Sequence, residues 1–181
     1  EEYARLIRTA QHQGNEKLSC LIQTLGSTGI RISELRHITV ESLRFGMAEI
    51  HNKGKMRRIL YPGELQKLLK KYAKKEKIES GPIFRSRSGK PLDRSNIWRM
   101  MKRLSHAAKV DAAKVYPHSM RHLFARCFYK IKKDIAKLAD VLGHSSIEIT
   151  RIYIKSTGRE HKRQLDSMRL VIGDGEQKKT T

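Results

Sequence analysis

The spacing of apolar residues constrains the fold of this chain more than any other feature, because most of it follows the period of an α-helix. Apolar stripes, together with residues typical of helix starts and stops, predict helices over 1–12, 16–26, 62–76, 93–109, 117–130, 134–142 and 159–172. Only residues 38–61 change period, and segments 38–43, 47–50 and 56–61 predict three short strands. We therefore expect a mainly α fold with a small three-stranded antiparallel β-sheet.

Glycine and capping residues predict where several helices begin and end. The glycines within residues 26–29 should stop the second helix, and a short helix should follow over residues 31–36. Gly143 should end the helix over 134–142. Residues 145–148, Ser-Ser-Ile-Glu, have the pattern of a capping box, so we expect another helix to begin there and to carry Tyr153.

The charge of the chain points to a polyanionic partner. The 181 residues suit one domain with a real core, and their formal net charge is +21. A domain this basic favours DNA or RNA as a partner. The sequence contains no long apolar span, lipidation signal or signal peptide, so we expect no membrane partner and a cytoplasmic location. Cys20 and Cys127 are too few and isolated for a disulfide framework or metal cluster, and their apolar neighbours predict buried thiols.

Four local patterns carry residue types that suit cleavage of a phosphodiester. Direct attack on a phosphate needs a nucleophile, donors for the non-bridging oxygens and an acid for the leaving alkoxide. The patterns are Thr28-Gly-Ile-Arg-Ile-Ser-Glu-Leu35, His51-Asn-Lys-Gly-Lys55, His118-Ser-Met-Arg121, and Leu142-Gly-His144 followed by Tyr153. They supply six candidate catalytic residues: Arg31, Lys53, His118, Arg121, His144 and Tyr153.

Two arginines are the candidates for holding the phosphate, because a guanidinium binds two phosphate oxygens at once. Arg31 follows a glycine-broken turn and precedes Glu34, which can orient it. Arg121 lies on one helical face with His118, close to a helix start where backbone N–H groups favour a phosphate. His122 shares that face, and we expect it to be a structural hydrogen-bond partner. For most other lysines and arginines a solvated charge is the better interpretation.

The acid and the nucleophile are less constrained by chemistry alone. Lys53 lies on a predicted turn, and Lys55 is an equal alternative as the acid. Tyr153 is the candidate nucleophile because it follows the helix stop at Gly143-His144, although a tyrosine at helical spacing is usually a core residue. The histidines are not spaced with carboxylates as metal ligands are, so we expect neither a metal nor another cofactor.

The order Arg, Lys, His-x-x-Arg, Leu-Gly-His, Tyr resembles the catalytic domain of the tyrosine recombinases, the phage integrase and Xer family. The resemblance covers residues 1 to about 170, and the motifs around Arg31 and from Leu142 to Tyr153 are its most specific parts. It implies the tyrosine recombinase catalytic-domain fold and DNA strand exchange without metal or nucleotide.

The resemblance also implies a role for each candidate residue. Arg31 and Arg121 would hold the scissile phosphate, and His118 and His144 would support it and help manage protons. Lys53 would protonate the 5′ oxygen, and Tyr153 would form a 3′-phosphotyrosyl link. Glu34 matches the acidic position behind the first arginine.

Domain organisation and partners follow from the same resemblance. We expect a catalytic domain over residues 1–172 and a disordered tail over 173–181. Relatives generally carry an N-terminal core-binding domain that this chain lacks, and we interpret the chain as a trimmed piece rather than a single-domain variant. Partners would be double-stranded DNA and further copies of the chain on DNA, as a tetramer linked through the amphipathic segment 159–172. The helix over 93–109 would lie near the major groove with Asn96, Arg99 and Arg103 toward DNA, unless this is a solvated basic face.

Two other functions remain compatible with these residues. A DNA-relaxing enzyme of the type IB topoisomerase class shares the chemistry but acts without a defined site or a partner. A catalytically silent DNA-binding module would share the fold, although the complete set of six residues argues against it. We expect a site-specific recombinase or integrase, of the kind that mobile genetic elements use for DNA integration.

Overall fold

The protein folds around one long buried helix in the computed structural model, which describes residues 1–52, 55–154 and 167–168. Lys53, the tail 173–181 and the segment 159–172, apart from residues 167–168, lie outside the described residues. The helices are α1 (Glu2–His12), α2 (Glu16–Thr28), η1 (Ile32–His37, a 3₁₀ helix), α3 (Val40–Phe45), α4 (Gly63–Lys75), α5 (Arg94–Ala107), η2 (Ala112–Lys114, also 3₁₀), α6 (Pro117–Lys132), α7 (Ile135–Leu142) and α8 (Ile147–Arg151). The strands are β1 (Met47–Asn52) and β2 (Lys55–Leu60).

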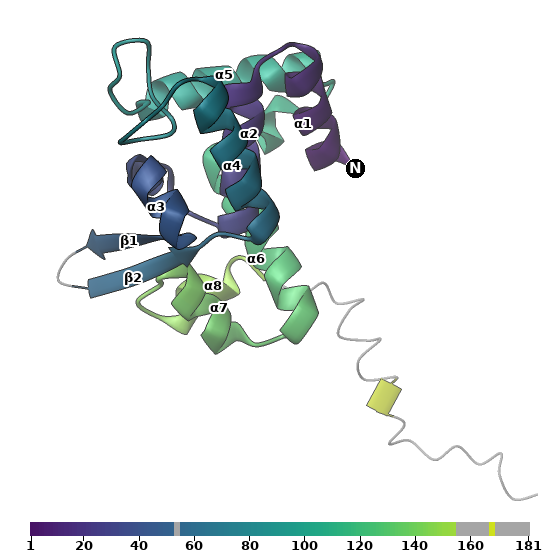
Figure 1. Ribbon diagram of the computed structural model, residues 1–181. Coiled ribbons are helices and arrows are strands. Elements are labelled where there is room, and N and C mark those ends of the chain that lie inside the picture. The colour runs from purple at the N-terminus through teal and green to yellow at the C-terminus, as the bar shows by residue number, and fades with distance from the viewer. Residues whose placement is uncertain (53–54, 155–166, 169–181) are drawn as a thin grey trace, which may run out of the picture.

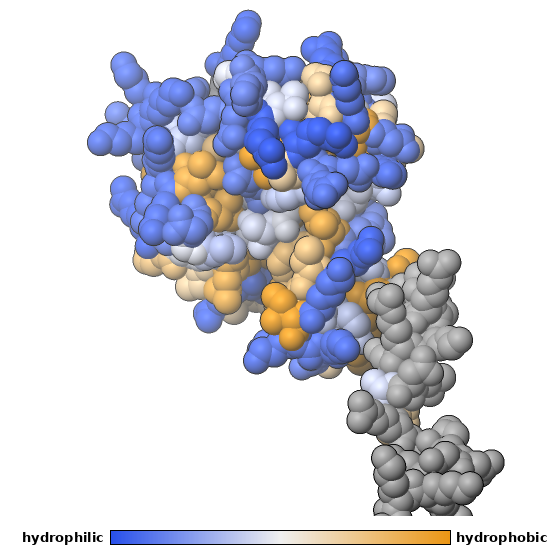
Figure 2. All heavy atoms as spheres, turned by 90° about the vertical axis from the view of Figure 1, so that its right-hand side faces the viewer, coloured by the Kyte–Doolittle hydropathy of each residue, from blue (hydrophilic) through white to orange (hydrophobic). Residues whose placement is uncertain are grey.

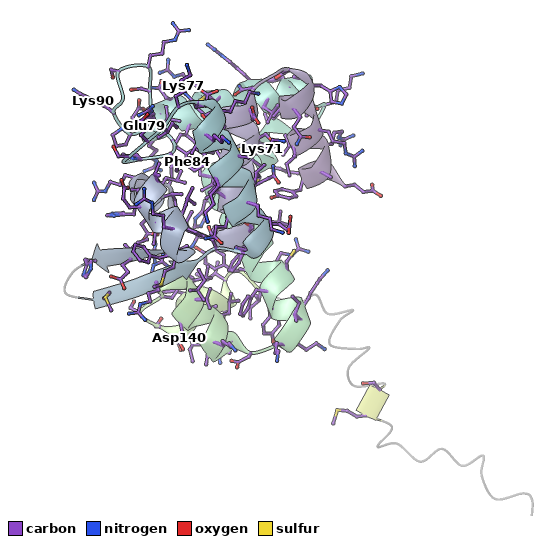
Figure 3. All side chains as sticks on the ribbon, viewed as in Figure 1. Lys71, Lys77, Glu79, Phe84, Lys90 and Asp140 are labelled. Carbon is purple, nitrogen blue, oxygen red and sulfur yellow. The ribbon has the colours of Figure 1, made fainter. Side chains whose placement is uncertain are left out.

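Helix α2 forms the centre of the main core, because buried residues, both apolar and small polar ones, cover most of its circumference. Leu21, Ile22 and Leu25 are fully buried, and helices α1, α4 and α6 pack around α2 (Figure 1). The loop after α4 adds the buried Phe84 to this core, whereas Lys77 and Lys90 of the same region are exposed (Figure 3). The mainly α prediction is therefore confirmed.

A smaller apolar cluster joins α6, α7 and the segment after α8. Its buried members are Ala125, Leu138, Leu142 and Tyr153, and partly buried Phe124, Phe128, Tyr129 and Ile154 pack against them. Tyr153 is thus held by apolar packing next to polar residues of α6. Figure 2 shows that hydrophilic side chains dominate the visible surface of the described residues and that apolar ones form separate patches. Within residues 1–52, 55–154 and 167–168, no helix has the length and apolar character needed to cross a membrane.

The prediction of a third strand over residues 38–43 is wrong. Strands β1 and β2 form an antiparallel pair with Met47 opposite Leu60, and this pair is the whole sheet among the described residues. Residues 40–45 instead form α3, because Thr39 and Ser42 each accept a hydrogen bond from the other's backbone N–H. Gly46 ends that helix in the left-handed conformation. This local capping outweighs the alternating apolar pattern.

Two helix boundaries and one cysteine also differ from the predictions. Helix α2 continues through Gly26, where the Tyr3 ring packs in the space that a Cβ would occupy, and it ends at Gly29 with φ +62°. Helix α8 begins after Ser146 and ends at Arg151, so Tyr153 lies beyond it rather than on it. Cys127 is exposed on α6.

The hairpin of β1 and β2 lies between α3 and the α7–α8 pair (Figure 1).

Replacing Gly29 with alanine should destabilise the protein more than the same change at Gly14. Both glycines have positive φ, +62° and +66°, and a left-handed alanine costs about 1–2 kcal/mol in either place. At Gly29 the added Cβ would also lie 2.5 Å from Cδ1 of Phe124, whereas at Gly14 it meets nothing within 4 Å. Urea unfolding of both variants measures the difference, and an equal decrease in unfolding free energy for the two would contradict this packing argument.

Candidate active site

A cleft of about 460 Å³ brings together four of the six candidate catalytic residues. Arg31 enters it from the segment after α2, His118 and Arg121 from the first turns of α6, and Tyr153 from the segment after α8. The other lining residues are Ile30, Ile32, Ser33, Arg94, Trp98, Lys102, Tyr116 and Pro117. Residues distant in sequence therefore converge on one cavity.

Arg31 is fixed by Glu34 and by the end of α7. The buried Glu34 carboxylate accepts the backbone N–H of Arg31 through Oε2 and its Nη1 through Oε1, each at 3.0 Å. Arg31 Nη2 donates to the carbonyl oxygen of Gly143 at 2.9 Å. Burial raises the pKa of Glu34, but the Arg31 backbone hydrogen bond and the charges of Arg57 and Arg31 outweigh it, so the pKa is lowered. Glu34 is therefore a carboxylate that orients a guanidinium.

Arg121 is buried, with 2% of its surface exposed. Its Nη1 donates to the carbonyl oxygen of Gly29, and its Nη2 donates to the carbonyl oxygen of Leu142 at 2.6 Å. Burial, and then the nearby charges of Arg31 and Arg57, lower the pKa of Arg121 to about 10. The side chain remains a cation at neutral pH, and its position is set by backbone carbonyls rather than by a carboxylate.

His144 is a neutral imidazole in this environment. Burial first, and then the charges of Arg121, Arg31 and Arg57, lower its pKa to about 4. Arg121 Nη2 lies 3.0 Å from His144 Nε2, and Thr150 Oγ1 lies 2.8 Å from Nδ1. Because a guanidinium only donates, Nε2 must be the acceptor, so the proton is on Nδ1 and is donated to Thr150.

Three imidazoles surround the ring of Tyr153. Its centroid lies 4.2 Å from that of His122, 5.2 Å from that of His144 and 5.4 Å from that of His118. The Tyr153 hydroxyl lies 3.2 Å from Nε2 of His118. Burial, followed by the charges of Arg121 and Arg31, lowers the pKa of His118, so this imidazole is able to accept a proton at neutral pH. His122 contacts the site through its ring, against Tyr153 and His118.

Arg57 is a residue of this region that lies outside the four sequence motifs. Its Nη1 donates to the carbonyl oxygens of Leu142 and Val141, and its Nη2 forms an ion pair with Glu34. A signal was present in the sequence, because Arg57 and the buried Ile59 are two positions apart in a strand and therefore share a face. The end of α7 thus receives three guanidinium groups.

Helix α5 presents a different face to the cleft from the one predicted to contact DNA. Arg94, Trp98 and Lys102, spaced at i, i+4 and i+8, line the cleft, and Lys102 Nζ lies 5.3 Å from the centre of the Trp98 ring. Asn96, Arg99 and Arg103 are not lining residues. Asp93 caps the start of α5 by accepting the backbone N–H of Asn96, Arg99 donates to the Asn96 side chain, and Arg103 is exposed.

Lys53 lies outside the described residues, between β1 and β2. The part of the chain that the structure describes contains no group of three or more histidine, cysteine or acidic side chains placed to hold a metal ion. The hydrogen-bond donors gathered here are guanidinium N–H groups, which suit an anion.

Comparison with known proteins gives this arrangement a family. A sequence model of the phage integrase family matches residues 1–160. The chain belongs to this family. A tyrosine recombinase from Agathobacter rectalis is 35% identical over 142 residues, which cover 75% of this chain and 46% of that protein. Tyrosine recombinase XerD from Staphylococcus saprophyticus is 33% identical over 142 residues, covering 74% and 48%. The phage integrase chain thus spans about half the length of these curated relatives.

Solved structures share the fold of this phage integrase family member. The crystal structure of XerA recombinase has a TM-score of 0.78 and 26% identity, and the match covers 94% of this chain and 62% of that one. XerH site-specific recombinase bound to difH substrate, in a pre-cleavage complex, has a TM-score of 0.74 and 22% identity over 94% of this chain and 52% of that one. The tyrosine recombinase fold expected from the sequence is confirmed, with two described strands instead of three.

The lowered pKa of His144 predicts a pH dependence of stability for this integrase domain. In the unfolded chain a histidine binds a proton near pH 6.5, whereas folded His144 does so only near pH 4. Protonation therefore favours the unfolded state, and the free energy of unfolding should fall as the pH decreases from 6.5 to 4. His144→Gln should weaken this fall, as measured by urea midpoints at pH 7 and pH 5. His106→Gln, at an exposed position of α5, is the control. The same pH dependence in His144→Gln as in the wild type would contradict the assignment.

Proposed function

We propose that this chain is the DNA-cleaving domain of a site-specific tyrosine recombinase or integrase. The observation that carries the proposal is the convergence of Tyr153, His118, Arg31 and Arg121 on one cleft. Family membership supports the same reaction, and the Tn1549 transposon integrase, a structural neighbour in complex with transposon right end DNA, supports our proposal of double-stranded DNA as the partner. The extreme positive charge of +21 is consistent with a polyanionic substrate.

The scissile phosphate would bind between Arg31 and Arg121. Arg31 and Arg57 pair with one carboxylate, Glu34, and Arg121 contacts the carbonyl oxygen of Leu142, so these four charged groups retain an excess of positive charge. A guanidinium has five N–H donors, and the contacts described for Arg31 and Arg121 leave donors on both for phosphate oxygens. Donors fixed before the reaction stabilise the charge that develops on non-bridging oxygens without reorganising.

Tyr153 would be the nucleophile. As its oxygen attacks phosphorus, the phenolic proton passes to Nε2 of neutral His118, which lies 3.2 Å away. The bond between phosphorus and the 5′ oxygen breaks, and Lys53 would donate the proton that this oxygen needs. The products are a 3′-phosphotyrosyl link and a free 5′ hydroxyl. His144 would support the phosphate site through its contact with Arg121.

The reaction exchanges one phosphodiester for another, so it needs no energy from a nucleotide, and the arginines supply the charge stabilisation. A 5′ hydroxyl from a second duplex would reverse the first step and join new strands. Exchange between duplexes requires further copies of the enzyme, so we propose self-association on DNA as a tetramer. The segment 159–172 is our candidate for the link between subunits, and it lies largely outside the described residues.

Replacing Tyr153 with phenylalanine should abolish covalent attachment to DNA. The test uses full-length protein and nicked suicide duplexes of varied sequence that lose the 5′ product after cleavage. We expect a denaturation-resistant adduct that mass spectrometry locates on Tyr153. Tyr129→Phe is a matched control because Tyr129 packs in the same small cluster, and it should retain the adduct. An adduct that persists in Tyr153→Phe, or none from the wild type on its native site, would refute the proposed function. The second result would favour a silent DNA-binding module.

The double variant Arg99→Ala/Arg103→Ala should weaken DNA binding and flatten its dependence on salt. We propose that α5 lies along DNA with these side chains and Asn96 toward the duplex. For each phosphate that the variant no longer neutralises, the slope of log affinity against log salt should decrease in magnitude by about 1. Lys71→Ala/Lys74→Ala on α4 removes the same charge from exposed positions that do not line the cleft. If both double variants changed the slope equally, or neither changed it, α5 would not be the DNA-contacting helix.

A further inference from the structure

Arg57 differs from its neighbour in β2 by the face of the strand on which it lies. Successive side chains of a strand point to opposite faces. Arg58 points outward, pairs with Glu49 at 3.1 Å and has 56% of its side chain exposed. Arg57 points inward with only 15% of its side chain exposed, although a guanidinium is costly to bury. A buried arginine in a hairpin of this size needs partners that compensate its charge.

Those partners are the ones that fix the two arginines of the cleft. Glu34 Oε2 pairs with Arg57, while Oε1 of the same carboxylate accepts from Arg31 Nη1 at 3.0 Å. The carbonyl oxygen of Leu142 accepts from Arg57 Nη1 and from Arg121 Nη2. Arg57 therefore shares one acceptor residue with each cleft arginine.

The last turn of α7 is suited to hold these cations close together. The carbonyl groups at a helix C-terminus carry partial negative charge, which favours cations there. Gly143 ends the helix with φ +63°, and a Cβ at this position would lie 2.5 Å from Cδ and 2.9 Å from Nη1 of Arg57. The absence of a side chain at Gly143 is therefore what lets Arg57 pack directly on the helix end.

Arg57 itself does not line the cleft, and both of its Nη atoms are engaged by Glu34 and by carbonyls of α7. We infer that Arg57 is a positioning residue for DNA cleavage, which sets the direction in which Arg31 and Arg121 present their donors to the phosphate. This inference rests on the proposed function. Without the Arg57 guanidinium, Glu34 and Leu142 would each have one cationic partner fewer, so both cleft arginines would be free to reorient.

The test compares Arg57→Met with Arg58→Met in full-length protein on two suicide duplexes. One duplex has the normal scissile phosphate, and the other has a methylphosphonate, in which a methyl group replaces a charged non-bridging oxygen. On the normal duplex, Arg57→Met should form the Tyr153 adduct roughly 10- to 100-fold more slowly than the wild type. This decrease in rate is smaller than the roughly 100- to 1,000-fold decrease that is typical when a charge-stabilising donor itself is removed. On the neutral duplex the difference should shrink to within about threefold, because misdirected arginines have less charge to stabilise.

Arg58→Met removes the same charge from the same strand and should react like the wild type on both duplexes. DNA affinity of Arg57→Met should stay within about threefold of the wild type, because Arg57 touches no DNA in this account. Arg57→Lys keeps the charge but cannot bridge the carboxylate and two carbonyls, so it should show the same pattern with a smaller defect. If Arg57→Met does not fold, as judged by circular dichroism, Arg57→Lys decides the question.

If Arg57→Met, or Arg57→Lys where Arg57→Met does not fold, formed the Tyr153 adduct on the normal duplex at the wild-type rate, the inference would be overturned and the proposed function would remain intact. An equal decrease in rate on both duplexes would also overturn it, because general disruption of the fold or displacement of Tyr153 is not relieved by neutralising the phosphate. Absence of adduct from the wild type on both duplexes would overturn the proposed function, and the inference with it.

Discussion

The gathering of three guanidinium groups at the C-terminal end of α7 is the interaction on which the rest of this site depends. Arg31, Arg57 and Arg121 come from a loop, a strand and a helix, and like charges at such short range repel strongly in a partly buried site. Glu34 and the last carbonyls of α7 compensate part of this repulsion. The compensation is incomplete, so the cleft is prepared for an anion before any substrate arrives.

This constraint explains why glycine occurs at the two ends of the arrangement. Gly29 has a left-handed conformation, and its carbonyl accepts from Arg121 while Phe124 and Leu142 fill the space beside it. Gly143 has the same conformation at the end of α7 and leaves room for Arg57. Both glycines belong to the motifs that characterise the sequence, and their role is structural: they let carbonyl groups and guanidinium groups approach each other closely.

The tyrosine is positioned by different forces. Tyr153 lies in the small apolar cluster of α6 and α7 with 8% of its surface exposed, and its ring is surrounded by His118, His122 and His144. Burial keeps these imidazoles neutral by lowering their pKa values. A neutral imidazole next to the hydroxyl is a proton acceptor, and a protonated one would not be. Apolar packing therefore serves the proposed chemistry indirectly, by setting the charge state of the groups around the nucleophile.

The sequence predicts helices well here because apolar periodicity and capping residues agree along most of the chain. The strand prediction for residues 38–43 is wrong, because a reciprocal cap between Thr39 and Ser42 stabilises a helix despite the alternating apolar pattern. Motif order alone indicated Arg31, His118, Arg121 and Tyr153, which the fold brings to one cleft. Arg57 shares a strand face with Ile59, but the sequence does not show its partners, the backbone carbonyls of α7, which only the tertiary structure places beside β2. The cleft-facing side of α5 was missed for a similar reason.

The most direct test of the central claim is a crystal structure of full-length Tyr153→Phe protein with an uncleaved duplex. The account predicts that non-bridging oxygens of one phosphate lie about 2.7–2.9 Å from guanidinium nitrogens of both Arg31 and Arg121, with the ring at position 153 directed at that phosphorus. Arg57 should keep its contacts with Glu34 and Leu142 and should not touch the phosphate. A duplex bound with no phosphate between Arg31 and Arg121, or with the ring at position 153 turned away from it, would contradict the account.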